Sequence, residues 1–181
     1  MGIYSEKAAD NFRDGYNCAQ SVLLAFADKV GLENEEALRL ASSFGGGMGR
    51  LREVCGAVSA MFMIAGLLKG YTSPNNDDAK AKHYALIQDL AAEFKSKHGT
   101  IICRELLGLD GTEFSPIPSV RTEEYYKERP CEDFIRCVAE IVEDELLLNF
   151  WFLLNKAVIN KLDSSFYNIL PNLYSMLQAW K

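Results

Sequence analysis

Apolar residues recur at helical spacing along almost the whole chain, and this pattern most constrains the fold. Ala8, Ala9 and Phe12 fall on one face of a helix near the N-terminus, and Ala37 and Ala41 do the same in a later segment. No segment alternates apolar and polar residues between hairpin turns, which is the pattern of a half-buried β-strand. The sequence therefore predicts an all-α protein, a compact bundle of about five to six core helices followed by an apolar helical extension.

Capping residues indicate where these helices begin. Ser5 is the expected N-cap of the first helix, Asn17 precedes the second, and Asn34 opens the third with two glutamates behind it. Asp77 is the expected cap of a long amphipathic helix. The predicted helices cover residues 5–14, 18–30, 35–44, 52–68, 79–97, 103–108 and 131–146, and the proline-bearing stretch 110–130 is predicted to be a loop.

A run of glycines, G-G-G-M-G-R at residues 45–50, interrupts the helical pattern. Glycines at this density do not sit inside a stable helix, so the backbone must turn here or approach a neighbour closely. One interpretation is an anion- or cofactor-binding loop formed by Gly45, Gly46, Gly47, Gly49 and Arg50. The favoured alternative is that the glycines let helices pack closely. No strand precedes the run and no Lys-Ser/Thr pair follows it, so neither the dinucleotide fingerprint nor the P-loop is present.

Charge and hydropathy exclude two classes of function. Asp and Glu number 25 against 19 Lys and Arg, a formal charge of −6, whereas nucleic-acid binders cluster basic residues. The longest apolar run, Leu146 to Leu154, is shorter than the roughly 20 residues that span a bilayer. The N-terminus lacks the apolar stretch of a signal peptide. We therefore expect a cytoplasmic protein that binds no nucleic acid and has no membrane span, in a compartment that keeps thiols reduced.

Three of the five cysteines fall in the first turns of predicted helices. Cys18 follows Asn17, Cys103 opens a short helical segment, and Cys131 follows Pro130. The partial positive charge at a helix N-terminus stabilises a thiolate and lowers a cysteine pKa. Free cysteine is also among the most buried residue types, so a structural role is the favoured explanation for any one of them alone.

The other two cysteines differ from these three and from each other. Cys55 lies just after Arg50 and Arg52, which can supply a similar positive field, whereas Cys137 is in the middle of a helix and is expected to be a core residue. The chain has no C-x-x-C pair. A dithiol or metal site would therefore have to be assembled from distant segments.

Taken together, several motifs resemble one protein family closely. It is the small bacterial and archaeal C_GCAxxG_C_C family, which is named for four cysteines and a C-G-A-x-x-G motif and is described as redox-active. The resemblance covers about residues 3–148 and rests on Gly15–Val22, Phe44–Arg50, Glu53–Ala57 and Cys103–Gly108. It implies that the four family cysteines are Cys18, Cys55, Cys103 and Cys131. Ala60 stands where the family motif has glycine.

The last 33 residues, 149–181, form a second predicted region that the resemblance does not cover. They hold both tryptophans and carry a net charge of +2, whereas residues 1–148 carry −8. We expect this apolar extension to be helical and to pack on the four-cysteine domain, residues 1–148, or against a second subunit.

Three functional hypotheses follow. In the first, the four cysteines are redox-active thiols of a thiol-based oxidoreductase that works with an unidentified redox partner protein, and Cys18 and Cys55 are the preferred attacking and resolving pair. In the second, the same four thiolates hold zinc, iron or an iron–sulfur cluster. In the third, the protein is a non-enzymatic adaptor that forms homo-oligomers through its apolar extension.

Overall fold

The computed structural model describes residues 2–109 and 115–148, and within them the backbone is helical apart from turns and one isolated β-bridge. This confirms the predicted all-α class. The helices are α1 (Ile3–Arg13), α2 (Cys18–Ala25), α3 (Ala27–Val30), α4 (Asn34–Ser42), α5 (Gly45–Met48), α6 (Gly56–Lys69), α7 (Asp77–His98), α8 (Cys103–Leu106), α9 (Glu123–Glu128) and α10 (Cys131–Ile141), which a π-helix (Val142–Leu148) continues.

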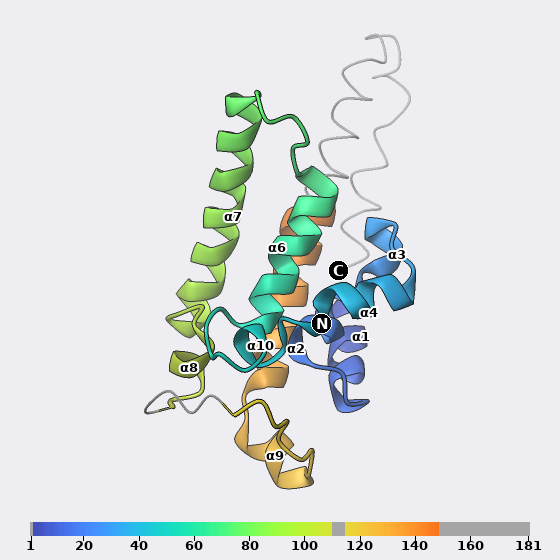
Figure 1. Cartoon of the computed structure of the whole chain (residues 1–181), viewed down its shortest axis with the longest axis vertical. Helices are drawn as coiled ribbons and strands as arrows, with labels where there is room; N and C mark the ends of the chain where they lie inside the picture. Colours follow the sequence, from blue (N-terminus) through green and yellow to red (C-terminus); the bar gives the residue numbers. More distant parts are fainter. Residues whose placement is uncertain (1, 110–114, 149–181) are drawn as a thin grey trace, which may run out of the picture. The chain divides into compact units, whose positions relative to one another are not determined.

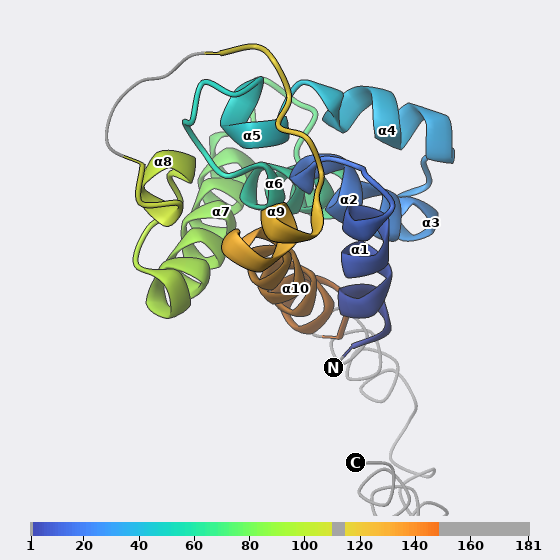
Figure 2. The same cartoon turned by 90° about the horizontal axis from the view of Figure 1, so that it is seen from below.

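The core is formed where α2 contacts α1, α4, α6 and α10. α1 also packs along α10, and α7 lies against α6 and α10 (Figures 1 and 2). Phe12, Phe26 and Phe94 are completely or almost completely buried, together with Leu23 and Ile135. The shorter helices α5, α8 and α9 gather at the end of the bundle where α6 and α10 begin (Figures 1 and 2). That end is the place where chemistry-bearing side chains from distant segments meet.

The capping residues predicted from sequence are partly correct. Asn17 caps α2 as expected, because its side chain accepts hydrogen bonds from the backbone of Ala19 and Gln20 in a complete capping box. The predicted cap at Ser5 is wrong: α1 already begins at Ile3, and Ser5 is a buried helix residue whose hydroxyl donates to Glu140. Because α1 begins two residues earlier than predicted, Gly2 is its N-cap and Ser5 is buried against α10.

Other predicted boundaries shift for local reasons. Glu33 caps α4 instead of Asn34, and Asn76 caps α7 instead of Asp77, each one residue before the predicted cap. The predicted helix 18–30 breaks at Phe26, which separates α2 from α3. α6 begins at Gly56 instead of residue 52, because residues 52–55 are not helical: Arg52 has a positive φ of 61°, and Val54 forms a β-bridge with Ile102. The predicted loop 110–130 contains α9.

Among the helices that the structure describes, none is both long and apolar enough to cross a membrane. Residues 149–181, the predicted apolar extension, lie outside the described residues, so the domain boundary at residue 148 and the oligomerisation hypothesis stay predictions. The cytoplasmic location also stays a prediction.

Candidate functional site

Four cysteines lie at the beginnings of four different helices. Cys18, Cys103 and Cys131 are the first residues of α2, α8 and α10, and Cys55 is the N-cap of α6. All four line one pocket of about 300 Å³ at the end of the bundle. Cys137, in the middle of α10, is buried and does not line this pocket. The structure thus brings together the four cysteines singled out in the sequence and leaves the fifth apart.

An antiparallel bridge between Val54 and Ile102 brings two of these cysteines together. The backbone N–H of Cys55 donates to the carbonyl of Ile101 over 2.8 Å, and the N–H of Cys103 donates to the carbonyl of Glu53 over 2.6 Å. These bonds fix the residues just before α6 against the residues just before α8. This pairing holds Cys55 and Cys103 near each other, and both line the pocket.

Two glycines allow the cysteine-bearing segments to approach this closely. A Cβ atom added to Gly47 would lie 2.6 Å from the Cβ of Cys103, and the φ of Gly47 is +70°. A Cβ added to Gly56 would lie 2.8 Å from the carbonyl oxygen of Phe44 and 3.3 Å from the Cβ of Cys18. The contacts at 2.6 and 2.8 Å are closer than real Cβ atoms tolerate, and the contact at 3.3 Å is tight. Close packing is therefore sufficient to explain these two glycines.

Backbone N–H groups in and after the glycine loop donate hydrogen bonds to carbonyl groups of the same loop. The N–H groups of Met48, Gly49 and Arg50 donate to carbonyls of residues 44–45, and Glu53 donates to Gly47. These four amides are therefore engaged within the loop. The loop lines the pocket, and a role of Gly45, Gly46, Gly47, Gly49 and Arg50 in binding an anion or cofactor stays a prediction.

Arg121 holds the turn that leads into Cys18. Its guanidinium donates to the carbonyl of Phe12 over 3.1 Å and to the carbonyl of Tyr16 over 3.0 Å. The same group stacks over the ring of Phe12, with 4.6 Å from Cζ to the ring centre, and lies 5.0 Å from the ring centre of Tyr125. Arg121 therefore ties the segment that precedes α9 and α10 to the turn between α1 and α2.

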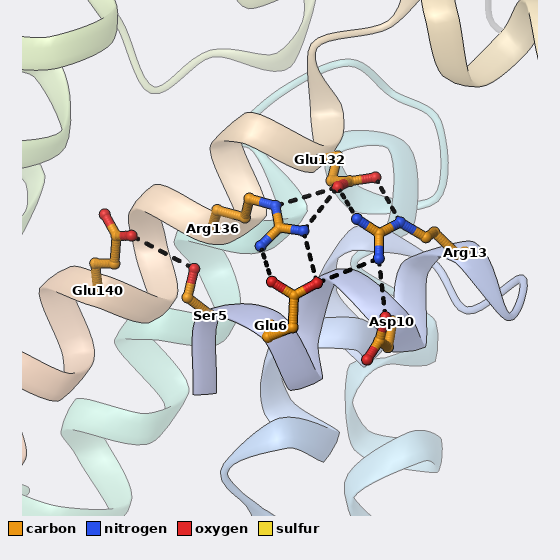
Figure 3. Close-up of polar contacts among 7 residues, drawn as sticks. All are labelled: Ser5, Glu6, Asp10, Arg13, Glu132, Arg136 and Glu140. Atoms are coloured by element: carbon orange, nitrogen blue, oxygen red, sulfur yellow. Dashed lines mark hydrogen bonds and ion pairs between the residues drawn. The ribbon is translucent and has the colours of Figure 1, made fainter. Parts of the chain in front are cut away.

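A network of ion pairs fixes the first turn of α10 against α1 (Figure 3). Arg136 donates to both carboxylate oxygens of Glu6 and also pairs with Glu132 over 3.0 Å. Arg13 pairs with the same two carboxylates. Glu132 directly follows Cys131, so the network holds the beginning of α10, and with it the cysteine, in place relative to α1.

Cys18 and Cys131 line the same pocket, and the ionisation of each thiol depends on the other. Hydrogen bonding with the Cys18 thiol is the largest influence that lowers the pKa of Cys131 below that of an ordinary thiol. It raises the pKa of Cys18 well above the ordinary value, and burial adds to that rise. The pair therefore loses its first proton from Cys131 and keeps the second on Cys18.

Arginine charges support the thiolate form of Cys131. Burial opposes ionisation, but the positive charges of Arg129, Arg121 and Arg52 lower the pKa of Cys131. Cys55 has no comparable support, and burial raises its pKa to about 12. Burial also raises the pKa of Cys103, although Arg52 Nη1 lies 4.0 Å from its sulfur and opposes the rise.

Sequence patterns did not identify Arg121, Arg129 or Tyr125, which line the pocket. These residues lie in the segment that was predicted to be a loop. The position of Arg129 two residues before Cys131 was the available signal, because a charge at that distance from a helix-starting thiol acts on its pKa.

The metal-site hypothesis has no support from side-chain positions. Within residues 2–109 and 115–148, no three or more His, Cys, Asp or Glu side chains are grouped closely enough to hold a metal ion. The five cysteines are free thiols in this structure.

Residues 16–145 match the protein family described as "Putative redox-active protein (C_GCAxxG_C_C)". The chain belongs to this family. No curated protein and no solved structure gives a significant match. The C_GCAxxG_C_C match spans the glycine loop and all four pocket cysteines. Ala60, the departure from the C-G-A-x-x-G motif, is completely buried in α6.

Proposed function

We propose that this C_GCAxxG_C_C protein carries out thiol–disulfide exchange, with Cys131 as the attacking thiolate and Cys18 as the resolving thiol. The observation that carries the proposal is that four helix-starting cysteines line one pocket, where the pKa of Cys131 is lowered and those of the other three are raised. Both cysteines line the pocket, so a substrate sulfur entering it meets them together. The family description as redox-active agrees with this class of chemistry.

The exchange balances as two successive displacements. The Cys131 thiolate attacks one sulfur of a substrate disulfide, the substrate S–S bond breaks, and one substrate thiolate leaves. That thiolate takes the proton of Cys18. The Cys18 thiolate then attacks the Cys131 sulfur of the mixed disulfide, and the second substrate thiolate leaves. The protein dithiol is oxidised to a disulfide while the substrate disulfide is reduced by two electrons to a thiol and a thiolate.

The sequence favoured Cys18 and Cys55 as the attacking and resolving pair, and we propose a different pair. A pKa of about 12 keeps the Cys55 thiol protonated at neutral pH, and the pKa of Cys18 lies well above the ordinary value. Neither thiol is suited to begin the exchange, because the thiolate is the nucleophile. Cys55 and Cys103 line the pocket beside the reacting pair.

Counting free thiols before and after oxidation with the uncharged bis(2-hydroxyethyl) disulfide tests the proposal. We expect the reversible loss of two thiols, restored by dithiothreitol. Cys131→Ser and Cys18→Ser should each abolish the paired loss, whereas the control Cys137→Ala, which removes a cysteine outside the pocket, should retain it. The proposal fails if the parent loses no pair of thiols or if both serine variants lose two thiols as the parent does.

A further inference from the structure

The arginines of this chain fall into two groups with different partners. Outside the pocket, each arginine forms an ion pair with a carboxylate. Inside the pocket, none of the four does so among residues 2–109 and 115–148. The paired arginines are Arg13, Arg39, Arg104 and Arg136, and the pocket arginines are Arg50, Arg52, Arg121 and Arg129.

Arg52 is the most unusual of the pocket arginines. Only 7% of its surface is exposed, and among residues 2–109 and 115–148 its guanidinium has one hydrogen-bond partner, the Cys103 sulfur at 4.0 Å. A buried charge without an opposite charge is costly, since it loses its hydration and gains little in return. A bound anion in the pocket would supply an opposite charge that no described carboxylate supplies.

The other pocket arginines are held in position by uncharged partners. Arg50 donates to the carbonyl of Ser115 over 2.7 Å and to the hydroxyl of Ser119 over 3.2 Å. Arg129 stacks on the ring of Tyr125, with 4.9 Å from Cζ to the ring centre. Each guanidinium is thus oriented while its charge remains uncompensated by any described carboxylate.

The pocket arginines also repel one another. Burial lowers the pKa of Arg50, and the charges of Arg52 and Arg129 lower it further. No Asp or Glu is found among the described residues that line the pocket, although the chain as a whole carries a charge of −6. The positive charge is therefore concentrated at the cysteines in an otherwise acidic protein.

We propose that this pocket binds a small anionic disulfide, one whose carboxylates pair with the pocket arginines while its sulfurs face Cys131 and Cys18. The inference rests on the proposed thiol–disulfide exchange at the same site. A volume of about 300 Å³ is at the lower end for small-molecule sites, which favours a low-molecular-weight substrate. Planar guanidinium groups suit carboxylates because they form two parallel hydrogen bonds.

The arginines also favour the chemical step itself. Each displacement releases a substrate thiolate, and the positive charges of Arg129, Arg121 and Arg52 stabilise negative charge at Cys131. The same field stabilises the departing thiolate, because it develops at the neighbouring sulfur. The arginines would therefore strengthen the binding of an anionic substrate and also speed the release of its thiolate.

Three disulfides of similar size and different charge test this inference. They are the dianion 3,3′-dithiodipropionate, the uncharged bis(2-hydroxyethyl) disulfide and the dication cystamine. The rate constant for oxidation of the protein by each is divided by the rate constant of that disulfide with free N-acetylcysteine amide. We expect the normalised rate to be at least about tenfold higher for the dianion than for the uncharged disulfide, and lowest for the dication. Raising the salt concentration from about 0.01 M to about 1 M should reduce the preference, because the Debye length falls from about 30 to about 3 Å.

Arg50→Gln should lower the dianion-to-neutral ratio by about tenfold, and Arg129→Gln provides a second variant in case the first disturbs residues 115–119. Arg39→Gln, which removes an exposed arginine that does not line the pocket, is the matched control and should leave the ratio unchanged. A normalised ratio near one in the parent, or an undiminished ratio in both pocket variants, overturns the inference. If the uncharged disulfide oxidises the Cys18–Cys131 pair in that case, the proposed function survives; if it does not, the proposed function fails as well.

Discussion

Cys18 and Cys131, the first residues of α2 and α10, line the same pocket, and the ionisation of each thiol depends on the other. This mutual dependence makes the two thiols unequal: the pKa of Cys131 is lowered and that of Cys18 is raised. Such an unequal pair is what a dithiol needs in order to attack first with one sulfur and resolve with the other.

Removing the Cys18 donor should make Cys131 less reactive. In Cys18→Ala the pKa of Cys131 should rise, because the hydrogen bond is the largest influence that lowers it. A hydrogen bond to a charged acceptor contributes about 1.5–3 kcal/mol, so alkylation of Cys131 by iodoacetamide at neutral pH should slow by about tenfold or more. Cys18→Ser keeps a donor and should slow it less. Equal pH profiles for the parent and Cys18→Ala would show that the bond does not control Cys131.

Arg121 should support both the fold and the thiolate. Arg121→Gln removes two hydrogen bonds to carbonyls and the stacking on Phe12, so we expect a loss of about 2 kcal/mol in the free energy of unfolding, measured by urea denaturation. It should also slow alkylation of Cys131, because one positive charge is lost. Arg39→Gln should change stability by less than about 0.5 kcal/mol. A similar change in the free energy of unfolding of both variants would contradict the role of Arg121 in holding the turn before Cys18.

Gly47 and Gly66 should respond in opposite directions to the same substitution. Gly47→Ala should destabilise the protein by about 3 kcal/mol, because the new methyl group meets Cys103 and the positive φ is unfavourable for alanine. Gly66 lies within α6 with no atom within 4 Å of an added Cβ, so Gly66→Ala should stabilise by up to about 1 kcal/mol. Thermal unfolding of both variants measures the contrast. A neutral effect at Gly47 would show that close packing does not explain this glycine.

The ion-pair network should make stability depend on pH in the acid range. Hydrogen bonds from Arg136 lower the pKa of Glu6 from 4.5 to about 2. The folded protein therefore binds fewer protons than the unfolded chain, so this contribution is complete above pH 4.5 and is lost as the pH falls towards 2. In Glu6→Gln, the decline of the urea midpoint between these pH values should be shallower than in the parent, whereas Glu35→Gln should follow the parent. Parallel curves for the parent and Glu6→Gln would contradict the role of the network.

Much of the fold could be predicted because local signals determine it. Asn17 and Gln20 form a capping box that sets the beginning of α2, and Gly31 ends α3 with a φ of 72°. The prediction failed where tertiary contacts decided the outcome. Ser5 is drawn into a helix by packing against α10, and residues 52–55 are not helical because they pair with residues 101–104.

The candidate site could be predicted only in part. Helix-starting positions and the family resemblance identified Cys18, Cys55, Cys103 and Cys131, but no local pattern relates Cys18 to Cys131. The two thiols influence each other because α2 and α10 pack together, which is a property of the whole bundle. The sequence also could not show that no described carboxylate forms an ion pair with Arg52, because ion pairs depend on the neighbours that a side chain has in the folded protein.

Mapping the disulfide that forms on mild oxidation tests the central claim most directly. Trypsin places each of the five cysteines on its own peptide, because cleavage after Arg136 separates Cys131 from Cys137. After oxidation with bis(2-hydroxyethyl) disulfide and alkylation of the remaining thiols at acid pH, mass spectrometry should find the Cys18 peptide linked to the Cys131 peptide. A Cys18–Cys55 link in its place, or no linked peptides at all, would contradict the account.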